Sequence, residues 1–429
     1  MKKRRGFPLV FLSVLLLTAL LLSGQPAARA AEDDTTEETV LYGTRVSPYL
    51  LPGAQGDTVI LRWTADSDQP VLVHYGLRNE PGTAPAETTV MEISPQRAVY
   101  ASCYTKATWF YSAELSIPES GYAYGLSEPG GVPSRWYDIA GENDGVLTAF
   151  LTSDSHISNE KEAGRIEAVL DSLSPVNAPE LICHTGDVNE DVRLSPNILI
   201  QGMESLRTVP IAAVCGNHDA MEKLYEFFRM PGLVMNRPNP NYTAQLLDYC
   251  FEKEDVLFIG LNMKSMDFQS HGDFIRKAVA DHPDCRWTVV MIHYSLFSNG
   301  SHGKDSDPLQ FQRNMAKVFS ETDVDLVLSG HDHEYDRSLL YKGEEPQPGT
   351  DDVIEEKRQG ETLYISLPTT TGTKFYRRVT EINEPPAVEA LKFAPGYVLT
   401  KFSRDAIILQ AYSIEGELVD AMVLKHPEA

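Results

Sequence analysis

Five apolar runs in this chain each end in a short group of acidic, amide or histidine residues. With their endings they read VLTAFLTSDSH, PELICHTGDVNED, VPIAAVCGNHD, RWTVVMIHYS and VDLVLSGHDH. Of the eleven histidines, five fall in the polar endings DSH, GDVNED, GNHD, IHYS and GHDH: they are His156, His218, His293, His331 and His333. Apolar runs of this kind are typical of buried strands. The fold must therefore place several polar groups at the ends of core strands.

Helical stretches alternate with these runs. RIEAVLDSL, AMEKLYEFF, HGDFIRKAVADH and LQFQRNMAKVFSE have helical character, and YCFEKEDVLFIGLN indicates a hairpin. The alternation predicts an α/β domain over residues 146–429 with largely parallel strands that are covered on both faces. A long surface loop at 341–360 and a C-terminal β meander complete the prediction. Open α/β sheets hold their sites at the carboxyl ends of strands, so we expect the five endings to meet there.

The region before residue 146 has a different pattern. Residues 31–145 contain short strand patterns such as TVILRWTA and WFYSAELSI, which predict a small all-β sandwich of the immunoglobulin or fibronectin type with a packing role. Residues 1–30 combine a basic start, an apolar run and small residues, as a secretory signal peptide does. An uncleaved anchor is the alternative. We expect a secreted, extracytoplasmic protein without stable membrane insertion after cleavage.

The charge of the chain limits its partners. Asp and Glu number 61 and Lys and Arg 37, and five of those basic residues lie in the first thirty positions. So acidic a chain repels polyanions, which argues against a nucleic-acid polymer as partner. An anionic small molecule would need a strong local positive charge. The five cysteines are too few for a disulfide scaffold, and only Cys250 with Cys285 is a candidate bridge, which the sequence leaves open.

Each polar ending has a plain structural explanation when taken alone. Gly-Asp is a common turn, and Asn217 or Asp219 could cap a helix. Taken together and in order, the endings favour a joint metal site, because imidazoles and carboxylates suit Zn, Mn and Fe. Four His, two Asp and one Asn are too many for one tetrahedral ion. Two ions that share a carboxylate would use them all, with Asp187 as the candidate bridge.

The ordered set DxH, GD, GNHD, a lone strand-end His and GHxH resembles the pattern of the calcineurin-like metallophosphoesterases. GHDHEYDRS is similar to the GHxHxYxR ending of their purple acid phosphatase branch, and the β-rich N-terminal region resembles the fibronectin type III-like domain of that branch. The resemblance implies a metallophosphoesterase β-sandwich flanked by helices. It also implies hydrolysis of phosphate esters at two divalent or mixed-valence metal ions.

The resemblance assigns roles to individual residues. It makes Asp154, His156, Asp187 and His333 ligands of one metal, and Asp187, Asn217, His293 and His331 ligands of the other. It also implies that Asn217, His218 and His302 contact the substrate, that Asp187 and His218 are catalytic, and that His218 protonates the leaving oxygen. Two positions depart from the purple acid phosphatase pattern, because His156 stands in place of Gly and Glu190 in place of a metal-bound Tyr. An iron-tyrosinate centre is therefore not expected.

The leading hypothesis is a secreted phosphoesterase that uses a metal-bridging hydroxide to attack small phosphate monoesters or diesters. The alternative is a non-catalytic adhesion or binding protein that works through its N-terminal module. The sequence does not indicate the oligomeric state. Other polar residues near the endings have either a supporting or a plain structural role, namely His184, Asp219, Asp332, Tyr335 and Arg337. The basic stretch at 374–378 is interpreted as a solvated strand face rather than a substrate contact.

Overall fold

A computed structural model describes residues 39–104, 108–141, 145–349, 353–376 and 387–427. The predicted signal peptide lies outside the described residues. Within those ranges, no helix is both long and apolar enough to cross a membrane.

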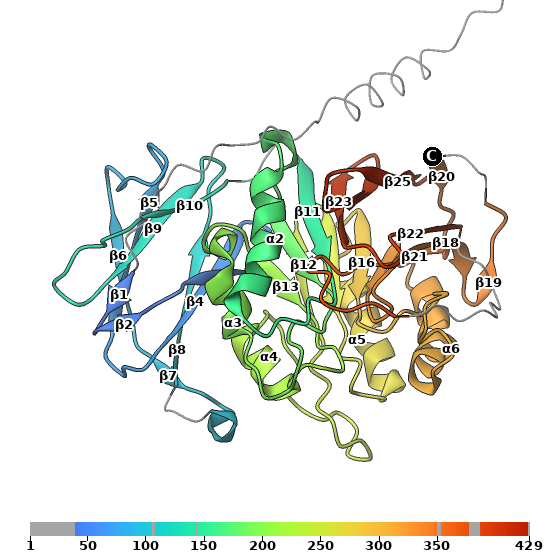
Figure 1. The fold of residues 1–429 in the computed structure, drawn as a ribbon, viewed down its shortest axis with the longest axis horizontal. Helices are drawn as coiled ribbons and strands as arrows, with labels where there is room; N and C mark the ends of the chain where they lie inside the picture. The colour runs from blue at the N-terminus through green and yellow to red at the C-terminus, as the bar shows by residue number, and fades with distance from the viewer. Residues whose placement is uncertain (1–38, 105–107, 142–144, 350–352, 377–386, 428–429) are drawn as a thin grey trace, which may run out of the picture.

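The N-terminal module consists of two antiparallel sheets that face each other (Figure 1). One sheet has the order β3 (Tyr49–Pro52), β4 (Thr58–Ala65), β8 (Trp109–Ser116) and β7 (Gln96–Arg97). The other has the order β10 (Tyr137–Ile139), β9 (Tyr122–Ser127), β5 (Val71–Leu77) and β6 (Thr89–Ile93). A short pair, β1 (Val40–Leu41) and β2 (Thr44–Arg45), precedes them. Trp63 stacks on Tyr111 in the core between the sheets, so the predicted all-β sandwich is confirmed.

The rest of the chain contains two larger sheets. The first has the order β13 (Ile211–Ala213), β12 (Leu181–His184), β11 (Val146–Thr152), β23 (Gly396–Ser403), β24 (Ile407–Ser413), β25 (Leu418–Lys425) and β20 (Ile354–Glu356). The second has the order β14 (Tyr249–Lys253), β15 (Val256–Gly260), β16 (Trp287–Met291), β17 (Leu326–Ser329), β21 (Thr362–Ser366), β18 (Tyr335–Lys342) and β19 (Glu345–Pro346), with β22 (Val388–Ala390) beside β18. One core joins inward residues of both sheets, such as Phe150 and Val289.

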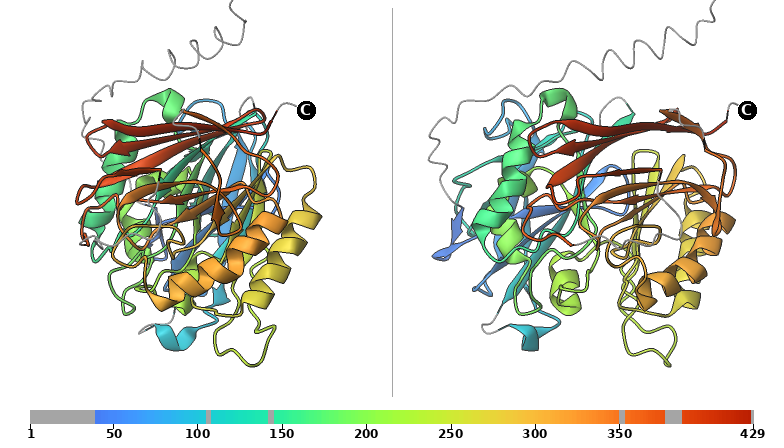
Figure 2. Two further views of the ribbon diagram at one scale, coloured as in Figure 1. Left: turned by 90° about the vertical axis from the view of Figure 1, so that its right-hand side faces the viewer. Right: turned by 45° about the vertical axis from the view of Figure 1, so that its right-hand side comes forward.

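Helices cover the outer faces of these two sheets (Figures 1 and 2). They are α2 (Glu160–Ser172), α3 (Asn197–Gly202) and α4 (Met221–Phe227) beside the first sheet, and α5 (Phe268–Asp281) and α6 (Ser306–Glu321) beside the second. Helix α2 begins after Asn159, whose side chain accepts a hydrogen bond from the Glu162 main-chain N–H. Helix α6 buries Phe311, Met315 and Phe319 at four-residue spacing, which gives it one continuous apolar face.

The arrangement confirms a β-sandwich flanked by helices and corrects three details. The strands are not largely parallel, because β11 to β13 are parallel whereas β23 to β25 pair in antiparallel fashion. Each sheet also packs on the other sheet with one face, so helices cover only one side of each. Residues 341–360 are not one long loop, since β18, β19 and β20 take up part of them. Cys250 and Cys285 are both free thiols.

The module is held against the first sheet by specific polar contacts. Tyr49 Oη donates to the Phe227 carbonyl at 2.8 Å, and Tyr124 Oη donates to the Arg207 carbonyl at 2.8 Å. The Glu226 carboxylate, which is 4% exposed, accepts the main-chain N–H groups of Val99 and Tyr100. These contacts fix the module on the side of α4.

Candidate metal centre

The seven predicted ligands follow strands of both large sheets. Asp154 and His156 follow β11, Asp187 follows β12 and Asn217 follows β13, all in the first sheet. His293 follows β16, and His331 and His333 follow β17, in the second sheet. Since the strands of each of these sets run parallel, their carboxyl ends lie at one edge. The two edges meet and bring the seven side chains together.

Five of these residues have a left-handed backbone. The φ angles are 49° for Asp154, 44° for His156, 51° for Asp187, 73° for His331 and 60° for His333. This region is uncommon for residues other than glycine, although Asp and His are enriched in it. Such conformations persist when the surrounding structure fixes them, and they cluster at functional sites. The backbone therefore bends sharply at each turn to direct these side chains toward one point.

Two glycines permit the turns to approach one another. A Cβ atom on Gly330 would lie 1.8 Å from Ser153 Oγ and 2.5 Å from Asp154 Oδ2. A Cβ atom on Gly216 would lie 2.1 Å from Asp187 Oδ1. All three distances are too short for atoms that are not bonded to each other, so only glycine fits at either position. The Gly in GHDH and in GNHD is thus a requirement of the site's packing.

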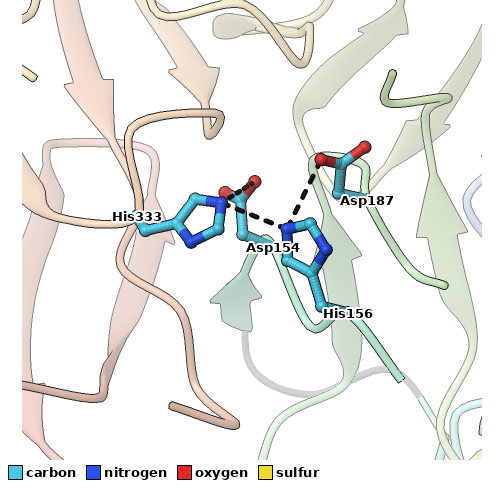
Figure 3. Close-up of side chains that lie close together, drawn as sticks. All are labelled: Asp154, His156, Asp187 and His333. Carbon is cyan, nitrogen blue, oxygen red and sulfur yellow. Dashed lines mark hydrogen bonds and ion pairs between the residues drawn. The ribbon is translucent and has the colours of Figure 1, made fainter. Parts of the chain in front are cut away.

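The first group of ligand atoms comprises Asp154, His156, Asp187 and His333, all of them buried (Figure 3). His333 Nε2 lies 3.2 Å from Asp154 Oδ1 and 3.1 Å from His156 Nε2. His156 Nε2 lies 3.5 Å from Asp187 Oδ2. Four ligand atoms at these separations surround a single small volume, which is the arrangement that one metal ion requires.

The second group shares Asp187 with the first. His293 Nε2 lies 3.5 Å from Asp187 Oδ2 and 2.9 Å from Asn217 Oδ1. His331 Nδ1 lies 3.2 Å from His293 Nε2. The Asp187 Oδ2 atom is therefore at the same distance from one imidazole of each group. The predicted bridging position of Asp187 agrees with this geometry.

Main-chain carbonyls set the orientation of two of the imidazoles. His293 Nδ1 donates to the Thr185 carbonyl at 2.9 Å, and His333 Nδ1 donates to the Lys374 carbonyl at 2.8 Å. These bonds place the proton on Nδ1 and leave the Nε2 lone pair for a metal. His156 Nδ1 lies 2.7 Å from Glu190 Oε2, although the contact lacks hydrogen-bond geometry. Its Nε2 atom likewise faces the other ligands.

The protonation states also fit a metal. Burial lowers the pKa of His156 and of His331 to about 2, so both are neutral imidazoles at ordinary pH. Burial acts to raise the pKa of Asp154, but the interaction with the His333 imidazole prevails and holds that pKa below its usual value. Asp154 Oδ1 is nevertheless buried without a hydrogen-bond donor. Neutral imidazoles and an unpaired carboxylate oxygen that face one another are suited to divalent transition metals.

The predicted substrate residues lie beside these ligands. The His218 main-chain N–H donates to Asp187 Oδ1 at 2.7 Å, and His218 Nδ1 donates to the Glu190 carbonyl at 2.7 Å. The His302 ring lies 4.2 Å from the His331 ring, centroid to centroid. Its Nδ1 contacts Asp305 Oδ2 at 2.8 Å, while its Nε2 has no hydrogen-bond partner among the described residues. The structure brings both histidines to the centre, and their catalytic and binding roles stay predictions.

Two acidic neighbours of the ligands, Asp219 and Asp332, accept hydrogen bonds from main-chain N–H groups of the surrounding loops. Asp219 accepts main-chain N–H groups from Val188, Asn189 and Gly216, so it ties the turns of Asp187 and Asn217 together. Asp332 accepts the His302 main-chain N–H at 2.8 Å and thereby supports the neighbouring loop.

Three other candidates do not reach the ligands. His184 Nε2 contacts Ser155 Oγ at 2.7 Å instead. Tyr335 and Arg337 both bind Asp420 at 2.7 Å, so these residues of the GHDHEYDRS stretch fix β18 to β25.

Sequence reasoning misjudged the basic stretch at 374–378. Lys374 and Tyr376 do not lie on a solvated strand, and the positions after 376 lie outside the described residues. Lys374 Nζ is 3.3 Å from His218 Nε2, and the Tyr376 ring is 4.5 Å from the His333 ring. Both side chains belong to the site. No strand or helix pattern marked them, and only the positive charge beside a run of threonines was visible in the sequence.

Comparison with known proteins agrees with this geometry. Residues 147–335 match the family of calcineurin-like phosphoesterases. The chain carries a calcineurin-like phosphoesterase domain. The matched residues contain all the predicted ligands. Together with the buried His–Asp cluster, this match identifies a metal-dependent phosphoesterase, a hydrolase of phosphoric esters. Comparison with curated protein sequences gives no match.

The fold of the phosphoesterase domain together with the module is found in a solved structure. The purple acid phosphatase PPD1 from yellow lupin (Lupinus luteus) seeds superposes with a TM-score of 0.70 at 13% identity, over 89% of this chain and 74% of that one. GAP50, the anchor in the inner membrane complex of Plasmodium, has a TM-score of 0.45 at 13% identity, over 66% of this chain and 90% of that one. A predicted phosphoesterase from Streptococcus pneumoniae has a TM-score of 0.31 at 13% identity, over 66% and 98%.

Proposed function

We propose that this phosphoesterase is a secreted enzyme with two metal ions that hydrolyses small phosphate monoesters or diesters. One observation carries the proposal: Asp187 Oδ2 lies 3.5 Å from His156 Nε2 and 3.5 Å from His293 Nε2. A single carboxylate oxygen thus stands between two sets of nitrogen and oxygen ligands. A site for a single metal ion would not require the second set of nitrogen and oxygen ligands.

The two sets of ligands would hold Mn, Fe or Zn. Bound there, a metal pair supplies Lewis-acid stabilisation of phosphoryl oxygens and a water of lowered pKa. Glu190 occupies the position at which purple acid phosphatases have a metal-bound Tyr, and its carboxylate contacts His156 instead. We therefore propose that the centre lacks a phenolate ligand and the colour that an iron-phenolate bond gives.

Side chains of the protein bind the phosphate oxygens and protonate the leaving oxygen. His218 Nδ1 is engaged by the Glu190 carbonyl, so Nε2 is the nitrogen that faces the site and that delivers the proton to the leaving oxygen. Asn217 Nδ2 is free to donate to the phosphate while Oδ1 faces His293. His302 Nε2, which has no hydrogen-bond partner among the described residues, supplies a further contact. The adhesion alternative finds no specific support in this arrangement.

Secretion is the second part of the proposal. It rests on the basic start, the apolar run and the small residues of positions 1–30. The proposed division places the sandwich module at 31–145 and the phosphoesterase domain at 146–429. N-terminal sequencing of protein recovered from the culture medium would give a start near residue 31. Recovery of the full-length chain in the membrane fraction would contradict cleavage.

The phosphoesterase proposal is tested by activity after metal reconstitution. Purified protein is loaded with Mn, Fe or Zn and assayed with p-nitrophenyl phosphate and bis(p-nitrophenyl) phosphate. We expect hydrolysis of at least one ester by the wild type and none above background by Asp187→Ala, because that variant loses a ligand of both metals. Metal content and circular dichroism of the variant serve as controls. Full activity in Asp187→Ala would refute the assignment.

A further inference from the structure

The segment after β21 is anchored to the turn that carries the first ligands. Thr369 Oγ1 donates to the Asp154 carbonyl at 2.8 Å. Thr371 Oγ1 and Thr373 Oγ1 donate to the Ser155 carbonyl at 2.7 Å and 3.1 Å. Three threonine hydroxyls thus bind one tight turn. Lys374, the residue after Thr373, is therefore held close to the turn that carries Asp154 and His156.

The next residue, Lys374, reaches the centre with two of its groups. Its main-chain carbonyl accepts from His333 Nδ1 at 2.8 Å, so its backbone orients a metal ligand. Its Nζ lies 3.3 Å from His218 Nε2 and 5.1 Å from the centroid of the Tyr376 ring. The Tyr376 ring in turn lies 4.8 Å from the His302 ring. The ammonium group therefore stands among the histidines that face the substrate.

Within the parts of the chain that the structure describes, the charge of Lys374 meets no neutralising carboxylate. Among the described residues, no ion pair joins its Nζ to a carboxylate. Other lysines in this acidic chain do have such partners, since Lys357 binds Asp325 at 3.0 Å and Lys317 lies 3.8 Å from Glu321. A half-buried ammonium without a counter-ion beside a substrate-facing histidine is an electrostatic site for an anion.

This geometry deepens the proposed function and rests on it. A phosphate monoester has three non-esterified oxygens and two negative charges at neutral pH, whereas a diester has two such oxygens and one charge. Two metal ions held by the proposed ligands would engage two of these oxygens. We propose that Lys374 binds the third non-esterified oxygen of a monoester and so makes the enzyme selective for phosphate monoesters over diesters. In a diester that position carries an ester group, which gains nothing from an ammonium.

The test compares two esters in matched variants. Lys374→Met removes the charge and keeps the main-chain carbonyl that orients His333. Lys374→Arg keeps the charge, and Lys317→Met makes the same charge change on the exposed face of α6. Each protein, with its metal content measured, is assayed for kcat/KM on p-nitrophenyl phosphate and on bis(p-nitrophenyl) phosphate. Binding of inorganic phosphate is measured by calorimetry.

We expect Lys374→Met to lower monoester kcat/KM by roughly 10- to 100-fold more than diester kcat/KM, the value of one charge-assisted hydrogen bond. Phosphate should bind more weakly by a similar factor, and the other two variants should keep the wild-type preference. If the ratio of monoester to diester kcat/KM is the same in Lys374→Met as in the wild type, the selectivity role is overturned while the phosphoesterase assignment stays intact. Failure of the wild type to hydrolyse either ester would overturn both.

Discussion

The metal centre and the contact between the two domains are both built from buried polar groups, yet they differ in one respect. At the domain contact, each oxygen of the Glu226 carboxylate accepts a main-chain N–H, at 3.1 Å from Val99 and 2.9 Å from Tyr100. At the centre, Asp154 Oδ1 has no donor, and the nitrogens of His156 and His333 face each other at 3.1 Å.

The two regions differ in whether their buried polar groups find hydrogen-bond partners within the chain. This difference distinguishes a structural contact from a functional site. A buried polar group costs free energy unless it is paired, so a set whose members find partners within the chain stabilises the fold. A set whose members face one another with lone pairs is incomplete without a ligand. In this molecule the cluster of the second kind lies where the two large sheets meet, within the residues that match the calcineurin-like phosphoesterase family.

Metal removal should produce the largest contrast between the two regions. Chelation should abolish hydrolysis and lower the midpoint of thermal unfolding by roughly 10 °C, since an ion present at a thousand times its dissociation constant contributes about 4 kcal/mol. Differential scanning calorimetry with and without chelator measures the shift. Asp187→Ala is the control and should show no response to the chelator. The same shift in that variant would mean that the stabilising metal lies elsewhere.

Glu190 offers a sharper test of the centre alone. Its Oε2 lies 2.7 Å from His156 Nδ1. Glu190→Ala should weaken metal binding by roughly 10- to 100-fold, the usual effect of removing a group that orients a metal-binding histidine. Titration against a competing chelator measures it. Glu190→Gln retains an acceptor and should recover most of the affinity. If both variants bind metal as tightly as the wild type, Glu190 has no orienting role.

Glu226 provides the opposite test at the domain contact. Glu226→Ala leaves two main-chain N–H groups without acceptors and should lower the free energy of unfolding by about 1–3 kcal/mol. Metal affinity and kcat/KM should be unaffected, because the contact lies on the α4 side of the first sheet. Glu222→Ala, on the same helix at a more exposed position, is the matched control. A fall in metal affinity with Glu226→Ala would show that the module helps to shape the centre.

The sequence predicted which side chains meet between the two large sheets, because the signal is local, whereas their role as metal ligands stays a prediction. Each ligand follows an apolar run within a few residues, and parallel strands bring such endings together without further information. The structure places all seven predicted ligands around Asp187 Oδ2 or its neighbours. Their assignment to individual metals stays a prediction from the family resemblance.

The parts that escaped prediction depend on contacts between distant residues. Lys374 reaches His218 across 156 positions, and the threonines before it bind carbonyls more than 200 positions away. No periodicity encodes such a contact. Tyr335 and Arg337 were similarly ambiguous until Asp420, over 80 positions distant, was seen to bind both. The mixed character of the first sheet has the same origin, because a C-terminal strand pairs with β11.

That pairing of β11 with β23 also bears on the order of folding. From Val146 opposite Ser403 to Leu151 opposite Val398, the strand that leads to Asp154 is completed by residues near the end of the chain. During synthesis one edge of β11 stays uncovered until about residue 403 has emerged, and an open strand edge invites wrong pairing. Assembly of the centre is therefore a late event, and uptake of metal would report that the whole chain has folded.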